Sequence, residues 1–144
     1  MILERQSDNL TLAAAFLAAR GARFVVIGGC ALRLHGYRHV PADLDVVPEP
    51  SAANVRALFE ALCELGTVGR ARPPSDRAVA TRDIVTHTSP IGSVDVLLAR
   101  GREEHATLEA RASSITVRGR SVPVASLDDV LRLRARFGKA PVDA

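Results

Sequence analysis

The chain lacks tryptophan and has one tyrosine and four phenylalanines, so aromatic residues make up only 3% of its 144 residues. It therefore offers few of the aromatic platforms on which binders of single-stranded nucleic acid stack bases. Lysine is nearly absent too, because Lys139 is the only lysine among 19 basic residues. Against 16 acidic residues the formal charge is +3, which is compatible with an anionic partner such as a nucleotide or RNA but identifies none.

Cysteine is equally scarce. Cys30 and Cys63 are the only two, and the sequence has no cysteine or histidine spacing typical of a zinc site. We expect both to be small buried thiols in a reducing compartment. The N-terminus is charged and has no continuous apolar segment, so no signal peptide is predicted. No run reaches the ~20 apolar residues of a membrane helix. Together these absences predict a cytoplasmic protein with no membrane partner.

The length fits a single domain covering residues 1–144, and 47% hydrophobic with 24% charged residues is ordinary for a globular protein. Helix and strand patterns alternate, which indicates an α/β protein without internal repeats. We expect a polar loop over residues 67–82. The expected helices cover residues 8–20, 29–35, 51–66 and 102–112, with a last one from Ser126; the expected strands cover 23–27, 43–47, 83–88, 93–99, 114–118 and 121–124.

The most informative segment joins two glycines to two aspartates. A strand pattern over residues 24–27 leads into Gly28-Gly29 and a short helix, and the next strand pattern carries Asp43 and Asp45. Residues i and i+2 of a strand share a face, so the two carboxylates are expected side by side. Such a pair is costly unless a positive charge lies between them, and Mg²⁺ accepts carboxylate and phosphate oxygens. Glycine lets backbone N–H groups approach a phosphate at a helix start.

Each of these features also has a plain explanation. An isolated Asp-x-Asp is more often a solvated strand end, and an isolated Gly-Gly is usually a turn. Their combination, in this order and within a strand–glycine–helix–strand frame, favours a phosphate and metal site.

This combination resembles the signature of the nucleotidyltransferase superfamily, most closely that of small bacterial and archaeal members found as toxin-like enzymes in toxin–antitoxin systems. The matching residues are Gly28, Gly29, Ala31, His35, Gly36, Arg38, Asp43 and Asp45. The sequence departs from the family at Pro41, where a threonine is usual, and at His39, where arginine is frequent. The resemblance implies the nucleotidyltransferase fold, a central mixed β-sheet flanked by helices.

The resemblance also implies a third carboxylate on a neighbouring strand. Asp95 is the candidate, because it lies at the centre of an apolar run where an unpaired charge would be expensive. A salt bridge to one of the arginines is the alternative. Asp83 is a rival acid, but its place at a strand start after Arg82 predicts exposure to solvent.

By resemblance, Asp43, Asp45 and Asp95 would be the catalytic residues and would bind Mg²⁺, or Mn²⁺ in its place. Gly28, Gly29, Arg38 and Arg134 would contact the nucleotide. The implied reaction moves a nucleoside monophosphate from an NTP to a hydroxyl of RNA (such as tRNA), of a protein or of a small molecule. An antitoxin is a further implied partner. The alternative is a catalytically inactive module that keeps the fold and binds a nucleotide or a partner.

The last predicted helix starts at Ser126, an N-cap residue followed three positions later by an acid. Its expected inward stripe is Leu127, Val130, Leu131 and Arg134. Arg134 stands where an apolar residue belongs and where the family has a lysine; it would contact triphosphate or acceptor, or else extend its charge to solvent. Residues 138–143 loosely match a further motif of the family, a glycine and a basic residue followed by Pro-x-Asp. Longer relatives continue with more helix, so part of the acceptor surface is expected either to be missing or to be supplied by a second subunit of a homodimer.

The histidines form no metal-ligand set. His35, beside Gly36, is expected to fix the loop through hydrogen bonds, with nucleotide contact as the alternative. His87 alternates with Val85 on the strand predicted to pair with the strand of Asp95. The sequence does not decide whether the His87 side chain lies on the same face as Asp95. Arg38 is exposed by pattern, either as a phosphate ligand or as a surface charge.

Overall fold

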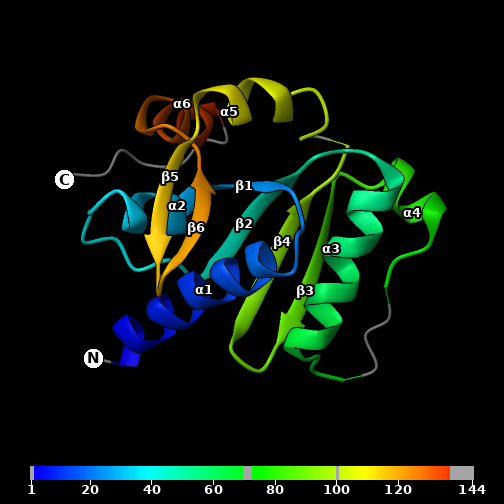
Figure 1. Cartoon of the computed structure of the whole chain (residues 1–144), viewed down its shortest axis with the longest axis horizontal. Helices are drawn as coiled ribbons and strands as arrows, with labels where there is room; N and C mark the ends of the chain where they lie inside the picture. The colour runs from blue at the N-terminus through cyan, green and yellow to red at the C-terminus, as the bar shows by residue number, and fades with distance from the viewer. Residues whose placement is uncertain (1, 70–72, 100, 137–144) are drawn as a thin grey trace.

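The computed structural model describes residues 2–69, 73–99 and 101–136, with side chains from residue 8 onward (Figure 1). Its six strands form one mixed sheet in the order β3-β4-β2-β1-β6-β5. The strands are β1 (Phe24–Ile27), β2 (Asp43–Pro48), β3 (Ile84–Ser89), β4 (Gly92–Leu97), β5 (Ser113–Val117) and β6 (Arg120–Val124). Strand β2 runs parallel to β4 and β1 parallel to β6, whereas the other three pairs are antiparallel. The predicted mixed sheet is confirmed.

Six helices accompany the sheet in the described part of the chain. They are α1 (Ile2–Ala19), α2 (Gly28–Leu34), α3 (Ala52–Leu65), α4 (Asp76–Thr81), α5 (His105–Arg111) and α6 (Leu127–Arg136). Helix α5 contacts β1, and α6 contacts α2, the short helix that begins with the two glycines. No helix in these ranges is both long and apolar enough to cross a bilayer.

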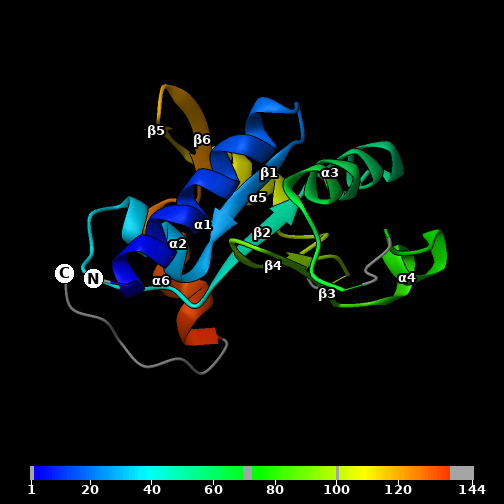
Figure 2. The ribbon, with the colours of Figure 1, turned by 90° about the horizontal axis from the view of Figure 1, so that it is seen from below.

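Helices α1 and α3 cover one face of the central strands, and Figure 2 shows them on the same side of β2 and β4. Side chains on that face are fully buried: Leu44, Val46, Val94 and Val96 have no exposed surface. Gly92 lies against Leu10 of α1, so that a Cβ there would clash with the leucine. His87 points to this same face, where its Nε2 lies 2.8 Å from the Gly66 carbonyl oxygen at the end of α3.

Several local predictions are confirmed. The helix expected over residues 51–66 is α3, which Ser51 caps by accepting a hydrogen bond from the Asn54 N–H at 3.3 Å. Strands β3 and β4 form the expected hairpin, with Ser89 opposite Gly92. Ser126 accepts a hydrogen bond from the Asp129 N–H at 3.2 Å and so caps α6 as predicted.

Three local predictions are wrong. Part of the expected loop 67–82 is helix α4, capped by Ser75, which accepts from the Ala78 N–H at 3.2 Å; residues 70–72 lie outside the described residues. The strands expected at 114–118 and 121–124 form a hairpin whose turn is Arg118-Gly119, one residue earlier than the 119–120 that those ranges predict.

The inward stripe of α6 is also wrong. Its buried residues are Asp129, Val130 and Leu133, whereas Leu131 is 37% exposed and Arg134 is half-buried. The physical reason is that two ion pairs compensate the buried charge of Asp129: its carboxylate lies 3.2 Å from Arg111 of α5 and 3.3 Å from Arg132. The further family motif at residues 138–143 lies outside the described residues.

Candidate active site

The three predicted acids project from one face of the sheet. In the parallel ladder of β2 and β4, Asp45 is directly opposite Asp95, and Asp43 is opposite Ser93. Neighbouring strands lie about 4.8 Å apart, and residues two apart on a strand share a face. Asp43, Asp45 and Asp95 therefore share the face opposite to α1 and α3, because the intervening Leu44 and Val94 point under those helices.

The acids lie at the margin of the core, with all three side chains half-buried. Asp95 accepts a hydrogen bond from the Thr86 hydroxyl at 2.5 Å, and Thr86 is its cross-strand neighbour on β3. Thr86 was not among the predicted site residues. The two-residue turn between Ser89 and Gly92 is the signal for it, because this turn fixes the hairpin register and places position 86 opposite 95.

Cys30 is a buried residue beside the acids, and their charges affect its thiol. Its Sγ lies 3.4 Å from the Asp43 carbonyl oxygen and the residue is fully buried, as predicted. Burial raises the pKa of the Cys30 thiol to about 12, with further contributions from the charges of Asp45 and Asp43. Cys30 therefore stays a protonated, inert thiol directly behind the acids.

The two glycines bring the start of α2 close to the acids. Gly28 has φ +70°, and a Cβ there would collide with the Asp45 carboxylate. At Gly29 a Cβ would lie 2.8 Å from His39 Nε2 and 3.0 Å from Pro41 Cβ. Close packing thus requires both glycines. In addition, the N-cap residue of α2 is Ile27, whose side chain makes no capping hydrogen bond.

The other predicted residues are placed as follows. Arg38 is exposed, as its pattern predicted, in the loop between α2 and β2. Arg134 lies on α6, which packs against α2. The His35 Nε2 is 2.7 Å from the Ala125 carbonyl oxygen, which ties the end of α2 to the start of α6 and agrees with the expected loop-fixing role. Asp83 is exposed, as predicted for the rival acid.

The donor chemistry of the shared face suits a hard divalent cation, since Mg²⁺ is commonly held by one or two carboxylates together with substrate phosphates and water. The neighbouring carboxylates of Asp45 and Asp95 meet that requirement through their register. As the side chains stand, no three His, Cys, Asp or Glu residues in the described ranges gather into a metal-holding group. The residues therefore fit a cation completed by a substrate better than a cage made by the protein alone.

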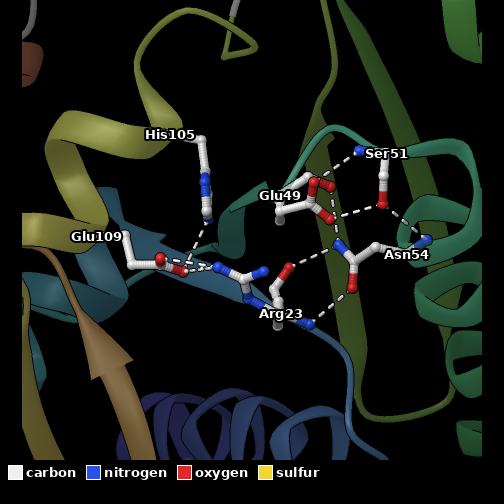
Figure 3. Close-up of polar contacts among 6 residues, drawn as sticks. All are labelled: Arg23, Glu49, Ser51, Asn54, His105 and Glu109. Carbon is white, nitrogen blue, oxygen red and sulfur yellow. Dashed lines mark hydrogen bonds and ion pairs between the residues drawn. The ribbon is translucent and has the colours of Figure 1, made fainter.

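A second polar cluster lies at the opposite end of β2 (Figure 3). Asn54 of α3 holds the chain there: its Oδ1 accepts from the Arg23 N–H at 2.9 Å, and its Nδ2 donates to the carbonyl oxygens of Arg23 and Glu49, each at 2.8 Å. Glu49 accepts from the Ser51 hydroxyl at 2.7 Å, and this hydrogen bond lowers the pKa of Glu49.

The same cluster reaches α5 through charged side chains. Arg23 donates to both carboxylate oxygens of Glu109, at 2.8 and 3.0 Å. His105 is buried, and its Nε2 lies 3.5 Å from Glu109 Oε2 without a hydrogen bond among the described residues. Burial is the main cause that lowers the pKa of His105. This cluster therefore contains both acids and bases, and it joins the ends of β1 and β2 to α3 and α5.

No protein-family model and no curated protein matches this chain. Its similarity is to solved structures. One is a Thermotoga maritima protein provisionally assigned as a nucleotidyltransferase, with a TM-score of 0.58, 18% identity, and coverage of 90% of this chain and 82% of that one.

Two further structures are similar. An antigenic nucleotidyltransferase-like protein from Paracoccidioides brasiliensis has a TM-score of 0.56 and 14% identity, with 91% of this chain and 65% of that chain covered. A Helicobacter pylori protein has a TM-score of 0.51 and 14% identity, with 90% and 56% covered. The chain thus spans less than two thirds of these two proteins. Its mixed six-stranded sheet, with three acids beside a glycine-led helix, has the nucleotidyltransferase fold.

Proposed function

We propose that this protein is a nucleotidyltransferase that moves a nucleoside monophosphate from an NTP to an acceptor hydroxyl. The observation that carries the proposal is the register of β2 and β4, which aligns Asp45 with Asp95 and sets Asp43 on the same face. The fold shared with nucleotidyltransferase-like structures supports it. So does the glycine-led start of α2, which touches the Asp45 carboxylate.

In this proposal Asp43, Asp45 and Asp95 hold Mg²⁺, or Mn²⁺ in its place. The bound cation supplies charge stabilisation at the phosphate oxygens, which is the main requirement of such transfers. Gly28 and Gly29 offer backbone N–H groups to the β- and γ-phosphates, and Arg38 and Arg134 add positive charge. These assignments follow the family resemblance.

The proposed reaction is a single displacement at the α-phosphorus. The acceptor oxygen forms a bond to the α-phosphorus while the bond from that phosphorus to the pyrophosphate oxygen breaks. The hydroxyl proton passes to Asp95, and pyrophosphate leaves. Asp95 lies on β4, which β2 separates from β1 and from the helix α2 that follows β1. The product is an acceptor that carries a nucleoside monophosphate.

The acceptor belongs to one of three classes: RNA such as tRNA, a protein, or a small molecule with a free hydroxyl. An antitoxin that restrains the activity and a second copy of the chain that completes the acceptor surface are further parts of the proposal. Growth arrest on expression, relieved by a neighbouring gene, tests the antitoxin. Sedimentation at micromolar concentration tests the homodimer, which a species that stays monomeric would exclude.

Label transfer tests the activity directly. The protein is incubated with each α-³²P-labelled NTP and Mg²⁺, with tRNA, cell lysate or small hydroxyl compounds as acceptors. We expect covalent labelling of one acceptor class and release of unlabelled pyrophosphate. Asp43→Ala and Asp45→Ala should abolish it. Labelling that persists in both variants would refute the proposal.

Two observations favour the second candidate, an inactive module that binds a nucleotide or a partner. Pro41, which replaces the family's usual threonine, is buried against Gly29, and the described acids do not gather into a three-residue metal group. This candidate predicts NTP binding by calorimetry with no label transfer under any acceptor condition.

A further inference from the structure

Asp95 has a hydroxyl partner on a neighbouring strand. The Thr86 hydroxyl donates to Asp95 Oδ1 at 2.5 Å. Both residues lie at one register position of the β3–β4 hairpin, so the contact is fixed by the backbone and not by a flexible loop. A hydrogen bond to a charged oxygen is among the stronger ones a side chain makes.

The contact leaves the two oxygens of Asp95 unequal. With Oδ1 engaged by Thr86, Oδ2 is the oxygen that stays available for a cation or for an acceptor proton. Rotation of the carboxylate about its χ2 bond would break the hydrogen bond, so Thr86 also restricts the orientation of the group. Outer hydrogen-bond partners of this kind orient metal ligands in known sites.

The neighbouring hydroxyl on β3 provides an internal comparison. Thr88 is two residues farther along β3, exposed and on the same face as Thr86, but its cross-strand neighbour is Ser93. The two threonines therefore share residue type, strand, face and exposure, and differ in whether an acid lies opposite.

We propose that Thr86 is a positioning residue that orients Asp95 toward the cation and acceptor of the transfer reaction. This inference rests on the proposed function. Thr86 acts through the carboxylate and does not touch the reacting atoms itself.

The test compares four proteins: wild type, Thr86→Val, Thr86→Ser and Thr88→Val. Valine keeps the β-branched shape that suits a strand and removes the hydroxyl, whereas serine retains it. Mn²⁺ binding is followed by electron paramagnetic resonance in the presence of each NTP, and label transfer is measured at varied Mn²⁺. Thermal melting checks that every variant is folded, and Thr86→Ala replaces the valine variant should that one not fold.

We expect Thr86→Val to weaken Mn²⁺ binding and to lower kcat by about tenfold or more, the usual size of such outer-partner losses. Thr86→Ser should restore both to within about threefold of wild type, and Thr88→Val should change neither. Unchanged Mn²⁺ binding and transfer in Thr86→Val, or an equal loss in Thr88→Val, would overturn the positioning role and leave the proposed function intact. A wild type that neither binds Mn²⁺ nor transfers label would overturn both.

Discussion

The two ends of strand β2 carry polar groups of opposite character. Where β2 begins, Asp43 and Asp45 share a face with Asp95, so charges of one sign converge. Where β2 ends, Glu49 belongs to a cluster in which Arg23 and His105 accompany the acids (Figure 3).

The difference separates a stabilising cluster from the proposed functional one. The cluster around Asn54 and Arg23 pairs backbone groups and charged side chains by internal hydrogen bonds and connects four elements, which is what a structural role requires. The acidic face places the like charges of Asp45 and Asp95 at one register position, where they repel each other. Departures from favourable local pairing of this kind are expected at functional sites.

The largest expected effect comes from Asp45→Asn, which keeps the shape of the side chain and removes one like charge. We expect transfer to fall by about 10³-fold, as loss of several kcal/mol of charge stabilisation implies. Label transfer measures the loss, and thermal melting checks that the variant is folded. The matched control is Asp83→Asn, an exposed acid outside the shared face, and loss of transfer in this control would contradict the assignment.

The opposite result is expected at the other end of β2. Asn54→Ala removes three hydrogen bonds to backbone groups and should lower the free energy of unfolding by about 2 kcal/mol while leaving transfer unchanged. Urea denaturation measures the loss. Glu60→Ala, an exposed change on the same helix, should have no measurable effect. A stable Asn54→Ala protein that has lost transfer would erase the distinction between the two ends.

A smaller effect, on the pH dependence of stability, is expected at Cys30, which lies beside the acidic end of β2. Its thiol has a pKa of about 12 in the folded protein against an ordinary 9.0, so the folded state retains the proton where the unfolded chain loses it. The free energy of unfolding should therefore fall as the pH rises from 9 toward 12. Cys30→Ala should remove this part of the slope in urea denaturation between pH 8 and 10.5. Cys63→Ala is the control, and an identical slope in Cys30→Ala would argue against the raised pKa.

The smallest expected effect is at His105. Burial lowers its pKa, Glu109 and Glu49 oppose the shift, and Arg23 adds to it. A folded pKa below the unfolded value means that stability is complete above pH 6.5 and is lost as the pH falls through the folded pKa. Titration of the imidazole Cε1 proton by NMR should show a midpoint below 6.5. A midpoint above that value would mean that Glu109 outweighs burial.

Local sequence rules predicted much of the fold and the acidic face. Alternation in β2, the caps at Ser51 and Ser126, and the tight β3–β4 turn each depend on residues close in the chain. The same rules place Asp43 and Asp45 together, and the family resemblance adds Asp95.

The misses share a different cause, which is contact between distant segments. The inward position of Asp129 depends on Arg111, 18 residues away, so the periodicity of α6 alone chose Leu131 instead. The cluster around Asn54 and Arg23 joins residues 31 apart and has no local pattern. Helix α4 was missed because a polar, proline-containing segment gives a helix signal that depends largely on its Ser75 cap.

The most direct measurement is a crystal structure with Mn²⁺ and an NTP, examined by anomalous scattering at the manganese edge. We expect manganese bound by carboxylate oxygens of Asp45 and Asp95, within about 2.5 Å of each, with the triphosphate lying along the start of α2. Manganese bound elsewhere, or a nucleotide seated without any metal contact to these two residues, would contradict the claim that the acidic face is a catalytic site.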